Sequence, residues 1–306
     1  MRFIALDWGT TRLRAILVDG LTAVHRAESD DGIARLRKGD HQAAFERVTG
    51  GWRAAEPDLP VVLVGMVGSR EGWFPAPYAE CPAGPEEIAA GAIPVEVGAD
   101  RRSHVLPGVL TRHGGGVDVM RGEETHLLGS GVQDGLVCLP GTHCKWAEMR
   151  AGRIARFATF MTGEMHALLR EHSMIGRPAA EPADPAGFAR GLADAWAADR
   201  GQEPGSLLNL LFRARAATVT GALPPAELGP YLSGLLTGDE IVGALRLFGT
   251  PRAVTIVADP PRSDLYVEAL GQRGITTTVV GQEATLLAGI ARILPHLGTA
   301  QGEHSP

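Results

Sequence analysis

Three features are scarce or missing in this sequence, and each excludes a class of protein. No apolar run approaches the roughly 20 residues that a membrane-spanning helix needs, so we expect no membrane partner. The three cysteines, Cys81, Cys138 and Cys144, show no Cys-x-x-Cys spacing, and their odd number without a recognisable secretion signal predicts reduced thiols in the cytoplasm. Positive charge is also in deficit: the formal net charge is −6, which argues against a surface for nucleic acid or anionic lipid.

What is present has an ordinary globular character. The 306 residues are 44% apolar and 21% charged, and a chain of this length can form two domains that share a cleft. Because the overall charge is negative, an anionic ligand would need a local cluster of arginine or lysine side chains.

Two apolar, strand-like runs flank the segment Asp7–Thr11 near the start of the chain. Gly9 allows a phosphate to approach the backbone, and Thr10 and Thr11 supply hydroxyl and N–H donors. Asp7 would hold Mg²⁺, usually through water, because a carboxylate and a phosphate repel each other directly. The segment therefore suits phosphate chemistry, with an ordinary hairpin whose aspartate caps a turn as the alternative.

A similar pattern recurs later in the chain, with apolar Leu136–Leu139 followed by Gly141, Thr142 and a second strand-like run. A unit that recurs after roughly 130 residues indicates two related domains. Each domain would offer one Gly-Thr hairpin to a ligand between them, and two such hairpins suit a polyphosphate better than one.

Two further segments place polar side chains at the ends of predicted elements. Ser69 and Arg70 follow a buried strand, at the carboxyl end where α/β sheets bind ligands, although a plain turn with a solvated arginine explains them equally well. Glu123 and Glu124 begin a short predicted helix, where the helix dipole favours carboxylates. The alternative is that one of them is a general base or an anchor for a sugar hydroxyl. Arg121 beside them could bind a carboxylate through two hydrogen bonds.

The second half of the chain predicts helices followed by an alternation of strands and helices. Thr162 is expected to cap a helix over Met165–Ser173, and residues 224–248 predict two helices. Strands at 253–258 and 275–280 alternate with helices, which predicts a parallel sheet edge whose loops could hold a nucleoside.

Considered together, these motifs resemble those of the 2-dehydro-3-deoxygalactonokinases, members of the actin-like ATPase and sugar-kinase superfamily, over essentially the whole chain. Any one motif is weak, whereas their joint order and spacing are strong. The residues that carry the resemblance are Asp7–Thr11 with Leu13–Arg14, Gly65–Ser69 with Gly72–Trp73, Met120–Thr125, Pro140–Trp146, Met161–Glu164 and Leu232–Leu236.

The resemblance implies an α/β fold of two ribonuclease-H-like domains, with mixed sheets flanked by helices and the active-site cleft between them. We expect one domain at residues 1–134, with the first phosphate hairpin and the sugar-acid site. The other is expected at residues 135–306, with the second phosphate hairpin and the nucleotide site, and its last helix could pack back on the first domain. The implied reaction moves the γ-phosphoryl group of ATP to the terminal 6-hydroxyl of 2-dehydro-3-deoxy-D-galactonate in galactonate catabolism.

The same resemblance implies a role for each candidate site residue. Asp7 organises Mg²⁺, Glu123 or Glu124 is the catalytic base with Glu123 preferred, and Arg121 is the first choice for the substrate carboxylate. The other candidates for substrate contact are Arg14, Ser69, Arg70 and Lys145. The residues expected to bind the cofactor ATP are Gly9, Thr10, Thr11, Gly141, Thr142, Lys145 and Gly281.

One departure and three alternatives accompany this interpretation. Asp259, Pro260 and Pro261 stand where the superfamily usually has small residues beside the adenosine, which could narrow the nucleotide pocket.

The nearest alternative is a kinase for a related keto-deoxy sugar acid such as the gluco epimer. The others are an actin-like regulatory or scaffold protein that binds ATP, and a hydrolase that uses water as nucleophile. The formation of a homo-oligomer stays open.

Overall fold

The computed structural model describes residues 1–97, 100–113, 116–202 and 205–298. The chain divides into two compact units. Unit 1 comprises Met1–Val137, Ala147–Phe157 and Val280–Pro306, and unit 2 comprises Cys138–Trp146 and Ala158–Val279. The C-terminal segment thus belongs to the same unit as the N-terminus.

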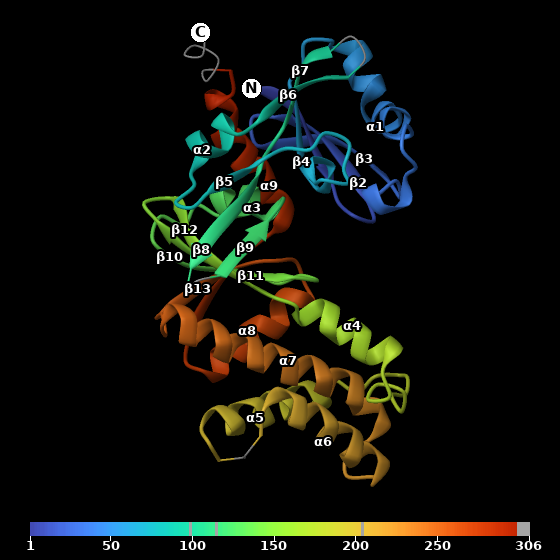
Figure 1. Cartoon of the computed structure of the whole chain (residues 1–306), viewed down its shortest axis with the longest axis vertical. Coiled ribbons are helices and arrows are strands. Elements are labelled where there is room, and N and C mark those ends of the chain that lie inside the picture. The colour runs from blue at the N-terminus through green and yellow to red at the C-terminus, as the bar shows by residue number, and fades with distance from the viewer. Residues whose placement is uncertain (98–99, 114–115, 203–204, 299–306) are drawn as a thin grey trace. The chain divides into compact units, whose positions relative to one another are not determined.

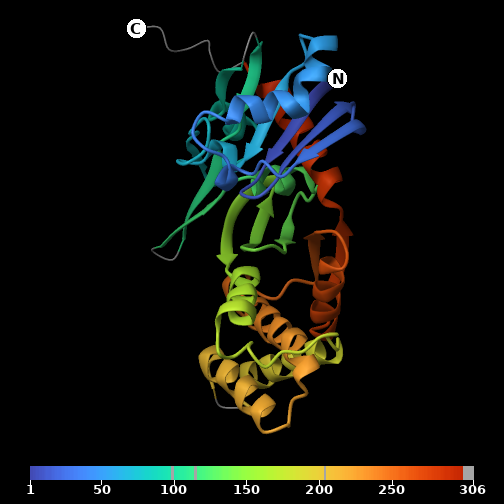
Figure 2. The same ribbon diagram turned by 90° about the vertical axis from the view of Figure 1, so that its right-hand side faces the viewer.

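A six-stranded mixed sheet forms the centre of unit 1, in the order β3-β2-β1-β4-β7-β6. Its strands are β1 (Arg2–Trp8), β2 (Leu13–Asp19), β3 (Thr22–Ser29), β4 (Val61–Gly65), β6 (Ile93–Val97) and β7 (Asp100–Val105). The first three form an antiparallel meander, visible as the blue arrows in Figure 2, and β4 pairs parallel with β1. Every residue of β4 is buried, as expected for a central strand covered on both faces.

Helices cover this sheet, and a small three-stranded sheet adjoins it. The helices and turns are η1 (Ile33–Arg35), α1 (His41–Ala55), η2 (Met66–Gly68), α2 (Pro85–Ala90), α3 (Glu123–Gly129), α9 (Gln282–Ile293) and η3 (Leu294–His296). The small sheet has the order β5-β8-β9, with β5 (Tyr78–Glu80), β8 (Gly108–His113) and β9 (Gly116–Met120). Trp8 and Phe45 lie in the core with less than 1% exposure each.

Helices α3 and α9 approach each other so closely that glycine is required at the crossing. A Cβ atom on Gly129 would lie 1.8 Å from the Thr285 carbonyl oxygen, and one on Gly289 would lie 1.9 Å from the Thr125 carbonyl oxygen. Any larger side chain would force the helices apart. This contact ties the last long helix to the short helix that carries Glu123 and Glu124.

The second large sheet has the order β12-β11-β10-β13-β14, and the division between the units falls within four of its strands, β10, β11, β12 and β14. The strands are β10 (Gly135–Leu139), β11 (Cys144–Arg150), β12 (Arg153–Phe160), β13 (Ala253–Val257) and β14 (Thr276–Val280). This order repeats that of the first five strands of the other sheet, β3-β2-β1-β4-β7. The predicted α/β fold class is confirmed, and both Gly-Thr segments lie in loops that join the first two strands of a meander.

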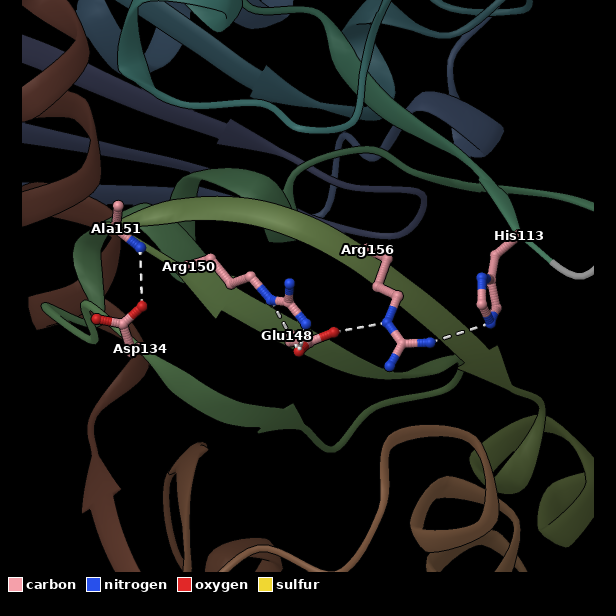
Figure 3. Close-up of polar contacts among 6 residues, drawn as sticks. All are labelled: His113, Asp134, Glu148, Arg150, Ala151 and Arg156. Atoms are coloured by element: carbon pink, nitrogen blue, oxygen red, sulfur yellow. Dashed lines mark hydrogen bonds and ion pairs between the residues drawn. The ribbon is translucent and has the colours of Figure 1, made fainter.

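Polar contacts secure the turn between β11 and β12. Ala151 adopts a positive φ of 49°, followed by Gly152 at 69°, as in a type I′ hairpin turn, and Asp134 accepts a hydrogen bond of 3.1 Å from the Ala151 amide. Figure 3 shows that Glu148 accepts hydrogen bonds from both Arg150 and Arg156, which lie on the two strands. These contacts explain why the chain reverses here.

Five helices complete unit 2: α4 (Thr162–His172), α5 (Ala186–Asp199), α6 (Leu207–Val219), α7 (Pro225–Phe248) and α8 (Arg262–Gln272). Helices α5, α6 and α7 lie side by side (Figure 1). A Cβ atom on Gly191 of α5 would lie 2.1 Å from the Tyr231 carbonyl oxygen of α7, and one on Gly234 would lie 2.0 Å from the Phe188 carbonyl oxygen. The expectation of two helices over 224–248 is wrong, because Gly234 and Gly243 serve as packing positions inside one helix and do not break it.

Candidate functional site

The loop Gly9–Arg12 joins β1 to β2 and is held from behind by the segment Gly32–Ala34. The Gly9 amide donates to the Arg12 carbonyl at 3.0 Å, and the Ile33 and Ala34 amides donate to the carbonyls of Gly9 and Thr10 at 3.0 Å each. A Cβ atom on Gly32 would lie 2.2 Å from the Thr11 carbonyl carbon, so glycine is required there. The side chains of Thr10 and Thr11 are exposed and accessible to a ligand.

Asp7 lies at the end of β1 against two glycines with positive φ. A Cβ atom on Gly65 would lie 3.5 Å from Asp7 Oδ1, and a Cβ atom on Gly122 would lie 3.3 Å from the Gly65 Cα. Gly65 and Gly122 have φ angles of 89° and 110°, which residues other than glycine rarely adopt. This stacking brings Asp7 close to the start of α3, and Arg14 Nε lies 3.9 Å from Asp7 Oδ2.

The two glutamates at the start of α3 occupy different environments. Both carboxylate oxygens of Glu124 accept from the Gly122 amide, at 2.9 and 2.7 Å, and the side chain is 1% exposed. Burial, reinforced by the neighbouring charge of Glu123, raises the pKa of Glu124 to about 7. Glu123 accepts from the Arg121 amide at 3.0 Å and is only half-buried. Glu123 is therefore the more accessible of the two carboxylates.

His126 lies one turn further along α3 and also lines the cavity in front of Asp7. Its Nδ1 lies 2.9 Å from the Thr285 hydroxyl on α9. Burial lowers the pKa of His126, while the negative charges of Asp7 and Glu123 raise it in part. The other lining residues of this cavity are Arg14, Ala15, Ile16, Arg26, Glu28, Gln282, Glu283 and Leu286. Within the described part of the chain, no group of three or more His, Cys, Asp or Glu side chains is arranged to hold a metal ion.

The Arg121 guanidinium is packed beneath the loop that follows β4. Its Nη2 donates to the Ala76 and Pro77 carbonyls at 2.9 and 3.3 Å, and its Cζ lies 4.3 Å from the centroid of the Tyr78 ring. Among the described residues, Arg121 Nε and Nη1 have no hydrogen-bond partner although they are buried, and the same holds for the Ser69 hydroxyl. Buried donors of this kind are costly, so a ligand that accepted hydrogen bonds from them would bind favourably.

In unit 2, the loop between β10 and β11 is covered by the start of α4. The Glu164 amide donates to the Thr142 carbonyl at 3.0 Å, and a Cβ atom on Gly163 would lie 2.4 Å from the Gly141 carbonyl oxygen. A cavity opens beside this loop and is rich in hydrogen-bond donors. Its polar lining comprises Gly141, Thr142, Thr162, His166, Ser233, Thr237, Arg262 and Tyr266. Hydroxyls and one guanidinium without a carboxylate among them suit an anion.

Several other predicted residues lie in places that the sequence did not indicate. Lys145 is 3% exposed and donates to the His143 carbonyl at 3.1 Å, and it is not among the residues that line the cavity beside its hairpin. Gly281 precedes α9 in unit 1, next to Gln282 and Glu283 of the Asp7 cavity. Arg70 is exposed in the loop after η2. The cofactor and substrate roles of these residues stay predictions.

The expectation that Thr162 caps α4 is wrong. The residue at the cap position is Met161, without a side-chain cap, and the Thr162 hydroxyl instead hydrogen bonds with the buried Glu240. The exposed Asp259–Pro261 segment leads into Arg262, which lines the cavity.

Sequence reasoning missed His166, Ser233, Thr237 and Arg262 as lining residues. Ser233 and Thr237 are spaced four apart and therefore share one face of α7, and that spacing was the available signal.

Two sheets with the same strand order, each with a Gly-Thr loop at the same point, define the actin-like ATPase and sugar-kinase fold. The similarity of a xylulose kinase from Lactobacillus acidophilus agrees with this class: its TM-score is 0.54 at 9% identity, over 98% of this chain and 90% of that chain. None of the described helices is long and apolar enough to cross a membrane.

The sequence profile of the 2-keto-3-deoxy-galactonokinase family matches residues 7–293. The 2-dehydro-3-deoxygalactonokinase of Escherichia coli strain K12 is 38% identical over 297 residues, which are 95% of this chain and 97% of that protein. The crystal structure of a proposed 2-dehydro-3-deoxygalactonokinase from Sinorhizobium meliloti has a TM-score of 0.82 and 31% identity, over 97% of both chains. The chain belongs to the 2-keto-3-deoxy-galactonokinase family, and the resemblance read from its sequence motifs is confirmed.

Proposed function

We propose that this protein transfers the γ-phosphoryl group of ATP to the terminal 6-hydroxyl of 2-dehydro-3-deoxy-D-galactonate. Membership of the family supports a sugar-acid kinase. The observation that carries the proposal is the pair of Gly-Thr loops at equivalent points of two sheets. One loop adjoins Asp7 and the other adjoins a cavity rich in donors. We assign each loop a role in binding nucleotide phosphates.

The residues of unit 1 supply the carboxylate that would hold Mg²⁺ and the general base. The partly exposed Asp7 carboxylate fits a Mg²⁺ ion that keeps most of its waters, since one or two protein carboxylates are typical for Mg²⁺ bound with nucleotide. When bound, Mg²⁺ would neutralise phosphate charge. Glu123 accepts the proton of the substrate hydroxyl. Glu124 holds the backbone at Gly122 and thereby orients the start of α3. Phosphoryl transfer depends chiefly on such alignment and neutralisation.

The residues of unit 2 bind the anionic end of the nucleotide. The backbone amide and the hydroxyl of Thr142 offer donors to phosphate oxygens. Arg262 adds one positive charge at the same cavity. Because these groups carry no negative charge, they complement the phosphates without a metal between them.

Arg121 and Ser69 bind the carboxylate of the sugar acid. Their buried donors, two nitrogens and one hydroxyl, have no acceptor within the described part of the chain, and a carboxylate supplies acceptors for both side chains. Arg121 also lies next in sequence to the segment that carries Glu123, so a substrate bound there keeps its hydroxyls near the base.

The test is a coupled assay of ADP release over a panel of keto-deoxy and ordinary sugar acids, with Mg²⁺ present. We expect ADP release that depends on the added acid, with the highest kcat/KM for the galacto epimer. A higher value for the gluco epimer would reassign the substrate. Phosphate release at the same rate without any acceptor would indicate a hydrolase, and ADP binding without turnover would indicate an actin-like binding protein.

A further inference from the structure

A buried carboxylate lies at the centre of the second half of the molecule, outside the residues already given a role. Glu240 on α7 is 2% exposed, and its Oε1 accepts from Trp146 Nε1 at 2.7 Å. Its Oε2 accepts from the Tyr266 hydroxyl at 2.8 Å, and the Thr162 hydroxyl and the Cys144 thiol form further hydrogen bonds with the carboxylate. Burial raises the pKa of Glu240, and these hydrogen bonds lower it in part.

The partners of Glu240 come from three different elements that border the unit 2 cavity. Trp146 belongs to β11, Thr162 begins α4 and Tyr266 belongs to α8. Both Thr162 and Tyr266 line the cavity themselves. One side chain therefore holds three walls of the cavity in fixed relation to α7.

The hydrogen bonds continue from Glu240 to the backbone of the Gly-Thr loop. The Tyr266 hydroxyl lies 3.2 Å from Cys144 Sγ, and that sulfur lies 3.3 Å from both the amide nitrogen and the carbonyl oxygen of Gly141. The start of α4, which Thr162 anchors, packs on the same loop through Gly163. Two routes thus connect Glu240 to the loop, one through Tyr266 and Cys144 and one through Thr162.

We propose that Glu240 is a positioning residue that holds the loop Pro140–His143 and the start of α4 in the arrangement that binds nucleotide phosphates. The inference rests on the proposed function, because it assigns the unit 2 cavity to a nucleotide. A buried carboxylate is an expensive way to stabilise a core, since a well-packed apolar side chain of similar size usually costs less. Its directional hydrogen bonds, in contrast, fix the orientation of three donors at once.

The principal test is the affinity for ADP, measured by calorimetry on the whole protein, together with KM for ATP and for the sugar acid. Glu240→Gln keeps the size of the side chain but replaces one acceptor oxygen by a donor. We expect its dissociation constant for ADP to rise at least about fivefold, with KM for ATP rising in parallel and KM for the sugar acid unchanged. Tyr266→Phe removes the hydroxyl that contacts both Glu240 and Cys144 and leaves the hydrogen bond of Glu240 with Thr162, so it should show the same pattern with a smaller change.

Glu227→Gln is the matched control. Glu227 is a second buried carboxylate on α7, but it accepts from Arg190 at 2.9 Å and does not border the cavity. This variant should lose stability and keep the wild-type affinity for ADP. Equal loss of ADP affinity in Glu227→Gln and Glu240→Gln, or wild-type affinity in a folded Glu240→Gln or Tyr266→Phe, would overturn the inference.

The design separates this inference from the proposed function. If the wild-type protein binds ADP but phosphorylates no sugar acid, the proposed reaction fails while the calorimetric comparison still decides the role of Glu240. If the wild-type protein binds no ADP, both are overturned. If Glu240→Gln does not fold, the comparison of Tyr266→Phe with Glu227→Gln gives the decision.

Discussion

The two Gly-Thr loops occupy the same point in two sheets of the same strand order, yet their surroundings differ in charge. The first lies on the strand pair that carries Asp7, near Glu123 and His126. The second adjoins hydroxyls and Arg262, and the buried carboxylate of Glu240 does not line its cavity and accepts from Trp146 and Tyr266. The strand order thus determines where each loop lies, whereas the packed side chains determine whether carboxylates or hydroxyls and a guanidinium surround it.

The largest expected effect follows from removing the charge at the first loop. Asp7→Asn should lower kcat by about a thousandfold or more, because the phosphate charge then lacks the metal that neutralises it. Steady-state kinetics at saturating Mg²⁺ measure this effect. Asp19→Asn, on the exposed end of the same strand pair, is the control and should be near wild type. A loss below tenfold for Asp7→Asn would mean that the first loop does not serve the metal.

The next effect separates the two glutamates. Glu123→Gln should lower kcat by about a hundredfold, because the general base is lost. Glu124→Gln should reduce kcat less, since its carboxylate only holds the Gly122 amide, and an amide oxygen can still accept that bond. Rate measurements on both variants test this order, and a larger loss in Glu124→Gln would reverse the assignment of the base.

If Arg121 binds the substrate carboxylate, replacing Arg121 should change the binding of the sugar acid and not that of ATP. Arg121→Met should raise KM for the sugar acid by about tenfold or more and leave KM for ATP unchanged, since a bidentate contact with the carboxylate is lost. Arg112→Met, on neighbouring β8 and paired with Glu80 at the surface, serves as control. An unchanged KM and kcat for the sugar acid would remove Arg121 from the site.

Gly32 and Gly163 each pack against one of the two Gly-Thr loops, and replacing them tests whether both loops contribute to nucleotide binding. Gly163→Ala would place a Cβ 2.4 Å from the Gly141 carbonyl oxygen, and Gly32→Ala would place one 2.2 Å from the Thr11 carbonyl carbon. Each loop must then shift, so we expect a several-fold rise in KM for ATP from either change. Gly271→Ala, which meets no atom within 4 Å in the described structure, should be silent. If only one of the two variants raised KM for ATP, nucleotide binding would depend on the loop next to that glycine alone.

The smallest expected effect concerns stability and not activity: the free energy of unfolding should depend on pH through Glu124. Burial holds the pKa of Glu124 at about 7, above its value in the unfolded chain, so the native state binds the proton more tightly. Ionisation therefore lowers stability as pH rises from about 4.5 to 7, by about 3 kcal/mol at most. Denaturant unfolding across this range should show Glu124→Gln gaining stability relative to wild type. A constant difference between the two would contradict the assignment.

Much of the fold could be predicted because its signals are local. The two Gly-Thr loops and the central strands β1, β4 and β10 stand out as apolar runs that end in glycine and hydroxyl residues. Strand β3 was missed because most of its side chains are exposed, so it has no apolar alternation. Helix α7 was predicted as two helices, whereas the chain continues as one helix past Pro230, and Gly234 and Gly243 allow close packing as their small size suggests.

By itself, the sequence determined the family, the fold class and the positions of Asp7, Thr10 and Thr142, because each depends on residues adjacent in the chain. Only the tertiary structure decided which glutamate is buried, that Ser69 and Arg121 hold unpaired donors, and that Glu240 connects Trp146, Thr162 and Tyr266. These groups are separated by tens of residues along the chain, so their meeting depends on how helices and sheets pack and leaves no local pattern to read.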